Sequence, residues 1–123
     1  MTEKLELYRC EICGNIVQIM HEGADALVCC GQPMNKVLPH GIEEEKKEKH
    51  VPVFLNENEI QVGSEPHPML EEHHIEFIQT ISDDKKHIYT KFLDINDKPV
   101  LKINNKYSNA REYCNIHGLW SNK

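Results

Sequence analysis

Residues 114–120, Cys-Asn-Ile-His-Gly-Leu-Trp, place a thiol and an imidazole three residues apart near the C-terminus. No cysteine lies between Cys30 and Cys114, and the four upstream cysteines suffice to close a metal site of their own. Cys114 and His117 therefore predict a second metal centre, whose remaining ligands must come from elsewhere in the chain. A buried cysteine with a purely structural role is the alternative interpretation of Cys114.

The upstream cysteines form the first candidate site. Cys10-x2-Cys13 and the adjacent pair Cys29-Cys30 offer four thiolates, which is the number that a closed tetrahedral zinc or iron site needs. An adjacent pair reaches one metal only if the backbone between its two residues is distorted. A structural zinc site is the simplest alternative to iron, and two disulfides are a poorer one because a bond between neighbouring cysteines is strained.

Composition and charge exclude several classes of protein. The 123 residues carry a net charge of -6, and the Lys-rich stretch at 43–49 is balanced by glutamates, so we expect no nucleic-acid partner. There is no apolar run long enough to cross a membrane, and residues 1–7 lack the pattern of a signal peptide. We therefore expect a cytoplasmic protein without a membrane partner, with thiols used as ligands rather than as disulfides.

The chain divides into two predicted units of all-β structure. In residues 1–38, short apolar runs punctuated by glycine predict small hairpins around the cysteines, and residues 39–49 are polar and predict a connecting segment. Residues 50–123 predict an antiparallel β-sandwich, since no stretch has a convincing helical period. Its candidate strands are residues 51–55, 59–62, 74–81, 88–93, 99–103 and 110–114.

Three histidines are candidate partners for Cys114 and His117. His50 follows the charged run, the prolines that flank His67 predict a rigid extended loop, and His73 follows six residues later. Four imidazoles and one thiolate would leave one coordination position open on iron or copper, which suits chemistry on a small molecule. A solvated loop residue is the alternative for each of the three; we expect His21, His40 and His87 to be surface residues.

Several motifs resemble those of desulfoferrodoxins, the two-iron class of superoxide reductases, and together they cover essentially the whole chain. Tyr8-Arg9-Cys10-x-x-Cys13-Gly14 and Leu27-Val28-Cys29-Cys30-Gly31-x-Pro33-Met34 are similar to the desulforedoxin-type domain. Glu48-Lys49-His50-Val51-Pro52, His67-Pro68-Met69 and the segment 110–120 are similar to the catalytic domain. The resemblance implies a rubredoxin-like or desulforedoxin-like domain at 1–38 and an immunoglobulin-like antiparallel β-sandwich at 50–123.

The same resemblance implies two iron ions and their ligands. Cys10, Cys13, Cys29 and Cys30 would hold the first iron; His50, His67, His73 and His117 would form the equatorial plane of the second, with Cys114 axial. One departure is His74, where related sequences often carry a tryptophan. The spacing from His67 and the residues that follow favour His73 over His74 as the ligand.

The implied activity is the one-electron reduction of superoxide to hydrogen peroxide, with a rubredoxin as electron donor and a homodimer as the assembly. Lys49 would attract superoxide and order a proton-donating water, and Glu48 would occupy the sixth position of the oxidised iron. The alternative for both residues is a solvated face of the charged run. Two other functions stay open from the residues alone: a rubredoxin-like electron carrier, and a zinc-stapled binding module without catalysis.

Overall fold

The computed structural model describes residues 1–41, 47–64, 67–103 and 107–123, without the side chains of residues 47 and 48. These residues form two compact units, Met1–Leu38 and Pro39–Lys123. The predicted connection at 39–49 lies partly outside the described residues. Within the described part, no helix has the length and apolar character needed to cross a bilayer.

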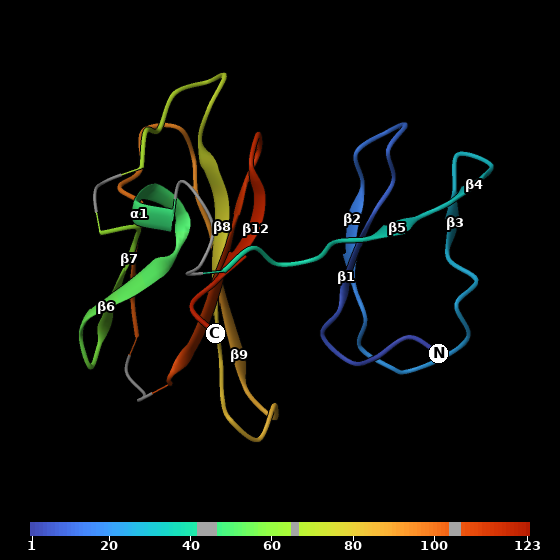
Figure 1. The fold of residues 1–123 in the computed structure, drawn as a ribbon, viewed down its shortest axis with the longest axis horizontal. Coiled ribbons are helices and arrows are strands. Elements are labelled where there is room, and N and C mark those ends of the chain that lie inside the picture. The colour runs from blue at the N-terminus through green and yellow to red at the C-terminus, as the bar shows by residue number, and fades with distance from the viewer. Residues whose placement is uncertain (42–46, 65–66, 104–106) are drawn as a thin grey trace. The chain divides into compact units, whose positions relative to one another are not determined.

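The smaller unit is built from very short strands. A three-stranded antiparallel sheet has the order β2-β1-β5, and β3 and β4 form a separate hairpin (Figure 1). The bounds are β1 Leu7–Arg9, β2 Ile16–Gln18, β3 Val28–Cys29, β4 Gln32–Pro33 and β5 Asn35–Lys36. The described apolar residues that are buried in this unit are Leu5, Leu7, Tyr8, Cys10 and Ile19. So small a core calls for a further stabilising element such as a metal.

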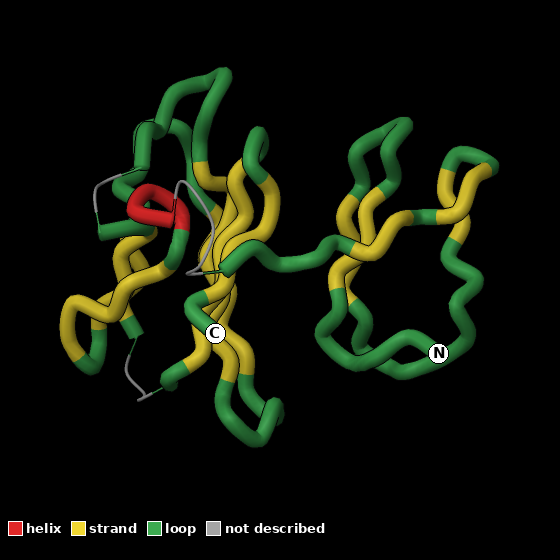
Figure 2. Tube along the Cα trace, viewed as in Figure 1, coloured by secondary structure: helices red, strands yellow, loops and turns green. Residues whose placement is uncertain are grey.

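The larger unit holds two antiparallel sheets, with strand orders β10-β7-β6 and β12-β11-β8-β9. Figure 2 shows that one helical turn, α1 (Lys47–His50), accompanies these strands. The strand bounds are β6 Pro52–Asn56, β7 Glu59–Val62, β8 Ile75–Ile81, β9 Ile88–Phe92, β10 Val100–Lys102, β11 Asn109–Cys114 and β12 Gly118–Ser121. The predicted strands are all present, whereas β12 and the helical turn were not predicted.

The two sheets pack through one apolar core. Ile60 and Val62 alternate inward along β7, and Ile75 and Ile78 of β8 are likewise fully buried. Leu101 from β10, Ala110 from β11 and the side chain of Cys114 join the same cluster. The prediction of an all-β fold with an antiparallel sandwich is confirmed, and the core reaches the thiol that the sequence singled out.

A local irregularity sets the position of Cys114 at the end of β11. Tyr113 pairs with Phe77 of β8, but Cys114 pairs with Ile75, so the register shifts between Tyr113 and Cys114. Such an irregularity turns a side chain relative to its regular strand neighbours, and irregularities of this kind are common next to functional sites. Here it places the Cys114 thiol at one end of the core, where β11 leads into the turn before β12.

Glu112 is a charged residue in an otherwise apolar part of the sandwich. It lies opposite Ile78 on β8 and Trp120 on β12, and it is fully buried. Neither carboxylate oxygen has a hydrogen-bond partner among the described residues. Burial raises the pKa of the Glu112 carboxyl well above its usual range, because the charged form loses its hydration without a compensating partner.

We expect Glu112→Gln to stabilise the protein progressively as pH rises from 5 to 8. A carboxyl whose pKa is raised in the folded state contributes stability below its unfolded pKa and loses it as pH rises. The neutral amide removes that loss, so the variant's advantage in free energy of unfolding should grow with pH. Chemical denaturation at several pH values, with the exposed Glu57→Gln as control, measures this. An advantage that is constant with pH would contradict the expectation.

Candidate metal centres

The four upstream cysteines converge on one point of the smaller unit. Their sulfur atoms all lie within 4.8 Å of one another, with 3.5 Å between the sulfurs of Cys13 and Cys29 and 4.0 Å between those of Cys29 and Cys30. All four thiols are free. Cys10 is buried whereas Cys13 and Cys30 are exposed, so one side of this cluster faces solvent.

Backbone conformation explains how an adjacent pair can share one site. Cys30 has φ of 54° and Gly31 has φ of 72°, so two successive residues lie in the left-handed region. This conformation is uncommon for a residue with a side chain, and it turns the chain sharply enough for both sulfurs to face the same point. The sequence predicted a distorted backbone at this pair, and the structure shows where the distortion lies.

Amide groups around Cys10 favour its thiolate form. Hydrogen bonds from the backbone N–H groups of Cys13 and Ile12 lower the pKa of the Cys10 thiol to about 6. The Cys13 nitrogen lies 3.5 Å from the Cys10 sulfur. Side-chain contact with Cys13, and then with Cys10 and Cys29, raises the pKa of Cys30 to about 12. These contacts thus favour the thiolate form of Cys10 and the protonated form of Cys30. A cation at the centre of the cluster would favour the thiolate form of both, since a coordinating thiol loses its proton.

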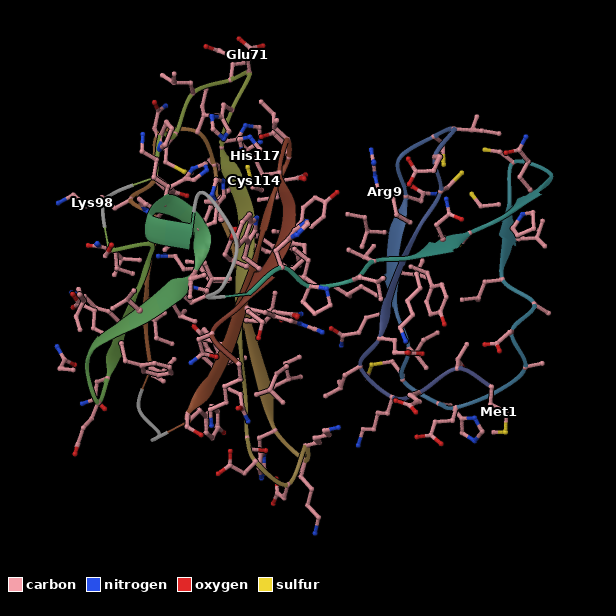
Figure 3. All side chains as sticks on the ribbon, viewed as in Figure 1. Met1, Arg9, Glu71, Lys98, Cys114 and His117 are labelled. Atoms are coloured by element: carbon pink, nitrogen blue, oxygen red, sulfur yellow. The ribbon has the colours of Figure 1, made fainter. Side chains whose placement is uncertain are left out.

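The second cluster lies in the larger unit. Ligand atoms from His50, His67, His73 and Cys114 all lie within 4.8 Å of one another. His117 belongs with them, because its Nδ1 lies 3.0 Å from His50 Nε2 and 3.8 Å from the Cys114 sulfur. The five residues come from α1, from the 67–73 loop and from the two ends of the β11–β12 turn. Figure 3 shows Cys114 and His117 next to each other at one end of the sandwich.

The four imidazoles form a closed ring of neighbours. Successive ring centroids in the order His50, His67, His73, His117 and back to His50 lie 4.8, 4.5, 5.0 and 4.7 Å apart. Each of these neighbouring pairs is nearly perpendicular, with interplanar angles of 71–81°. His50 and His73 lie across the ring from each other at 6.3 Å. The arrangement is that of four ligands around a square.

The tautomer of His67 suits a ligand. Its Nδ1 lies 2.7 Å from the carbonyl oxygen of Pro68, which can only accept, so Nδ1 carries the proton and donates it. The lone pair of Nε2 then faces the cluster, 3.2 Å from His50 Nε2. Burial lowers the pKa of His67 to about 4, so this imidazole is neutral at pH 7. Such a backbone partner is the usual device that orients a metal-binding histidine.

Cys114 lies against this ring of imidazoles from the direction of the core. Its sulfur is 3.5 Å from His67 Nε2 and accepts a hydrogen bond from the backbone N–H of His117 at 3.5 Å. Burial raises the pKa of the Cys114 thiol, and the N–H groups of His117 and Ile116 oppose that effect. These two backbone N–H groups would therefore stabilise the thiolate form of Cys114.

Asn115 is a structural residue of the site that the sequence did not reveal. Its Oδ1 accepts from the His74 backbone N–H at 2.9 Å, and its Nδ2 donates to the Glu72 carbonyl at 3.1 Å. Its own backbone N–H donates to the His74 carbonyl at 3.1 Å. These bonds tie the loop that carries His73 to the turn that carries Cys114. His74 instead directs Nδ1 at the carbonyls of Leu70 and Glu71, at 3.0 and 3.1 Å.

The two predicted charged residues of the site lie on α1. Lys49 directly precedes His50 on this helical turn, and its side chain is exposed. The side chain of Glu48 lies outside the described residues. The helical turn thus holds Lys49 next to His50, a member of the ring of imidazoles, although no helix was predicted there.

Comparison with known proteins gives concordant matches along the chain. Residues 2–37 match the family described as desulfoferrodoxin, N-terminal domain, and residues 42–123 match the family described as desulfoferrodoxin. A desulfoferrodoxin from Syntrophotalea carbinolica is 47% identical, over 100% of this chain and 99% of that protein. A superoxide reductase from Pyrococcus furiosus is 36% identical, over 63% of this chain and 88% of that protein.

The fold is also similar to a solved structure. The crystal structure of the superoxide reductase from Treponema pallidum matches with a TM-score of 0.73 and 27% sequence identity, and the match covers 100% of both chains. The four-cysteine cluster and the cluster of four histidines and one cysteine match the two iron centres of desulfoferrodoxins.

We expect Asn115→Ala to weaken metal binding at the histidine cluster by roughly tenfold, because residues that orient ligands typically contribute this much. Asn115→Asp keeps the acceptor for the His74 N–H and removes the donor to Glu72, so it should weaken binding less. Competition with a chelator of known affinity measures both variants, and the cysteine cluster of the same protein serves as the internal control. Equal affinity in the alanine variant and the wild type would contradict the role of Asn115.

Metal binding at the histidine cluster should release one proton from Cys114 at pH 8. The raised pKa keeps this thiol protonated until a metal arrives, whereas His67 is already neutral. Adding excess Zn²⁺ to metal-depleted protein in a weakly buffered indicator solution counts the released protons. Cys114→Ala should release about one proton fewer than the wild type. Identical proton release would show that Cys114 does not lose its proton to the metal.

Proposed function

This chain belongs to the desulfoferrodoxin family, and we propose that it is a superoxide reductase whose catalytic iron is held by His50, His67, His73, His117 and Cys114. It catalyses the one-electron reduction of superoxide to hydrogen peroxide without release of oxygen. The observation that carries this proposal is the square of four imidazoles with a single thiol against it. Five protein ligands leave one position for a small substrate.

Bound iron supplies the electron and the open coordination position. The surrounding side chains and backbone groups determine how this position treats the substrate and the product. Cys114 would be the thiolate ligand of the iron, and the electron density that it donates would favour departure of the peroxide product. The N–H groups of His117 and Ile116 stabilise the thiolate charge of Cys114, and Pro68 holds His67 in the ligand tautomer. Burial of His50, His67 and Cys114 keeps water away from the core side of the site.

The local charge at the site explains how an acidic protein attracts an anion. The chain has a net charge of -6, which repels superoxide at long range. A ferrous ion with four neutral imidazoles and one thiolate keeps a net positive charge, and the exposed Lys49 adds another next to His50. Positive charge concentrated at one end of a low-dielectric domain raises the local concentration of an anionic substrate. Lys49 also orders a water that donates a proton to the product.

The first iron is assigned to Cys10, Cys13, Cys29 and Cys30 in a domain spanning residues 1–38, with residues 39–49 as the connection and 50–123 as the catalytic domain. A rubredoxin-type protein supplies the electrons, and the chain assembles as a homodimer in the cytoplasm. The five free thiols support a reducing compartment, because oxidation to disulfides would remove ligands from both sites.

The deciding experiment measures superoxide consumption together with the yields of peroxide and oxygen. The proposed reaction gives one peroxide per superoxide and no oxygen. Oxygen at half the superoxide consumed would mean dismutation and would refute the proposal. Metal analysis and a visible spectrum add an independent readout, since a colourless protein containing zinc would leave only a binding module, and a single Fe(Cys)4 spectrum would leave only an electron carrier.

Lys49→Ala should slow the capture of superoxide by roughly tenfold, which is the lower range of electrostatic steering effects. The visible spectrum of the iron should stay unchanged, because Lys49 is not a ligand. Pulsed delivery of superoxide measures the capture rate at several ionic strengths. Lys86→Ala is the matched control, since Lys86 is an exposed lysine in the β8–β9 turn, at the end of β8 away from Ile75 and the site. Equal rates in the two variants would remove Lys49 from substrate attraction.

Glu48→Ala should leave the capture rate within about twofold of the wild type. We assign to Glu48 the role of a carboxylate that would bind the oxidised iron after the substrate has left. The variant should change the spectrum of the oxidised protein instead of the capture rate. A marked slowing of capture would show that the roles assigned to Glu48 and Lys49 are wrong.

A further inference from the structure

Trp120 is in ring contact with two histidines of the larger unit. The indole stacks on His50 with ring centroids 4.7 Å apart and an interplanar angle of 20°. The ring of His40 lies 4.8 Å away from the indole, tilted by 37°. Trp120 is the only tryptophan of the chain and is 3% exposed. His40, expected to be a surface residue, is half-buried.

The same indole also makes a polar contact with the imidazole cluster. Its Nε1–H donates a hydrogen bond to the backbone carbonyl of His117 at 3.1 Å. One side chain therefore contacts two of the four histidines, His50 through its face and His117 through its N–H group. The two are neighbours in the ring of imidazoles, with Nε2 of one and Nδ1 of the other 3.0 Å apart.

The backbone around Trp120 is itself held on both sides. On β12, Trp120 pairs with Glu112 of β11. On the other side, His40 forms a short parallel bridge with Trp120, in which the His40 N–H donates to the Leu119 carbonyl and the Ser121 N–H donates to the His40 carbonyl. Strand pairing with Glu112 and the bridge to His40 thus hold the Trp120 backbone on both sides, and the indole contacts the rings of His40 and His50.

These contacts restrict the ring plane of His50 and the backbone position of His117. An imidazole binds a metal only when its ring plane points the nitrogen lone pair at the ion, and a flat aromatic neighbour restricts rotation of that plane. The carbonyl of His117 lies at the end of the turn from Cys114, so a bond to it fixes where the turn closes. Both effects come from one rigid side chain.

We propose that Trp120 is a positioning residue, which holds the His50 ring and the His117 backbone in metal-binding geometry, with His40 packed against the indole. The inference rests on the proposed function only in taking the imidazole cluster as the iron site. It assigns no contact between Trp120 and the substrate. The opposing view is that Trp120 contributes only to the packing of the sandwich.

Two substitutions separate the two contacts of the indole. Trp120→Phe keeps an aromatic face against His50 and removes the N–H donor to His117, whereas Trp120→Leu removes both. Phe77→Leu is the matched control, because Phe77 stacks on Tyr113 in the same sheet, with centroids 5.7 Å apart, and its ring contacts among the described residues are with Tyr113 and Phe92. The control lowers the stability of the sheet without touching the cluster.

The readouts are metal affinity and the spectrum of the bound metal. We expect Trp120→Leu to weaken Co²⁺ binding at the histidine cluster by roughly 10–100-fold, and Trp120→Phe to restore part of that loss. The ferric form of the leucine variant should show a shifted thiolate-to-iron band, whereas Phe77→Leu should bind Co²⁺ and absorb like the wild type. Equal affinity and an equal band in Trp120→Leu and Phe77→Leu would overturn the proposal.

Fluorescence provides a test that does not depend on the leucine variant folding. Trp120 is the only indole, so Co²⁺ entering the histidine cluster of the wild type should quench the tryptophan emission, and Trp120→Phe still reports affinity through the cobalt absorption. An affinity of Trp120→Phe equal to that of the wild type would also overturn the role of the N–H contact. A wild type that takes up metal only at the cysteines would instead refute the proposed function.

Discussion

The ring of imidazoles depends on a fold that holds several nitrogen and sulfur atoms able to bind a metal within hydrogen-bond distance of one another. His67 Nε2 presents a lone pair to His50 Nε2 at 3.2 Å, because its Nδ1 is committed to the Pro68 carbonyl. The buried thiol of Cys114 lies 3.5 Å from the same nitrogen. Hydrogen bonds among these groups depend on which tautomer each histidine adopts, whereas a metal ion would use the lone pairs of all of them at once. The surrounding structure holds them together in advance of the metal.

The fold supplies this preorganisation from separate parts of the sandwich. The register shift at the end of β11 directs Cys114, the turn to β12 brings His117 back to it, and α1 presents His50. Asn115 then fixes the loop that carries His73. Each device costs some regular pairing at the end of the sandwich. The sandwich also contains buried polar groups that have no hydrogen-bond partner among the described residues, namely the Glu112 carboxyl and the Thr80 hydroxyl.

Most strands and both ligand clusters were predicted from the sequence, whereas strand β12 and several contacts around the histidine cluster were not. Alternating apolar residues predicted the strands from β6 to β11, and the spacing of Cys10, Cys13, Cys29 and Cys30 predicted a shared site. Strand β12 was not predicted, because its residues overlap the motif around His117, which was interpreted only as a source of metal ligands. Asn115, Trp120 and His40 were missed for another reason. Their roles arise from hydrogen bonds and ring contacts between segments far apart in sequence, and no local pattern encodes such contacts.

The two clusters differ in exposure, and this difference fits two different roles. The sulfurs of Cys13 and Cys30 face solvent in a unit with a small core, so a metal there both stabilises the unit and lies close to its surface. In the other cluster His50, His67 and Cys114 are buried, and only His73 and His117 are half-buried. Cys114 contacts the cluster from the core, and Trp120 contacts His50 and His117, so the exposed parts of the cluster belong to the half-buried His73 and His117. The exposed Lys49 directly precedes His50, so a positive side chain lies next to this cluster in the chain.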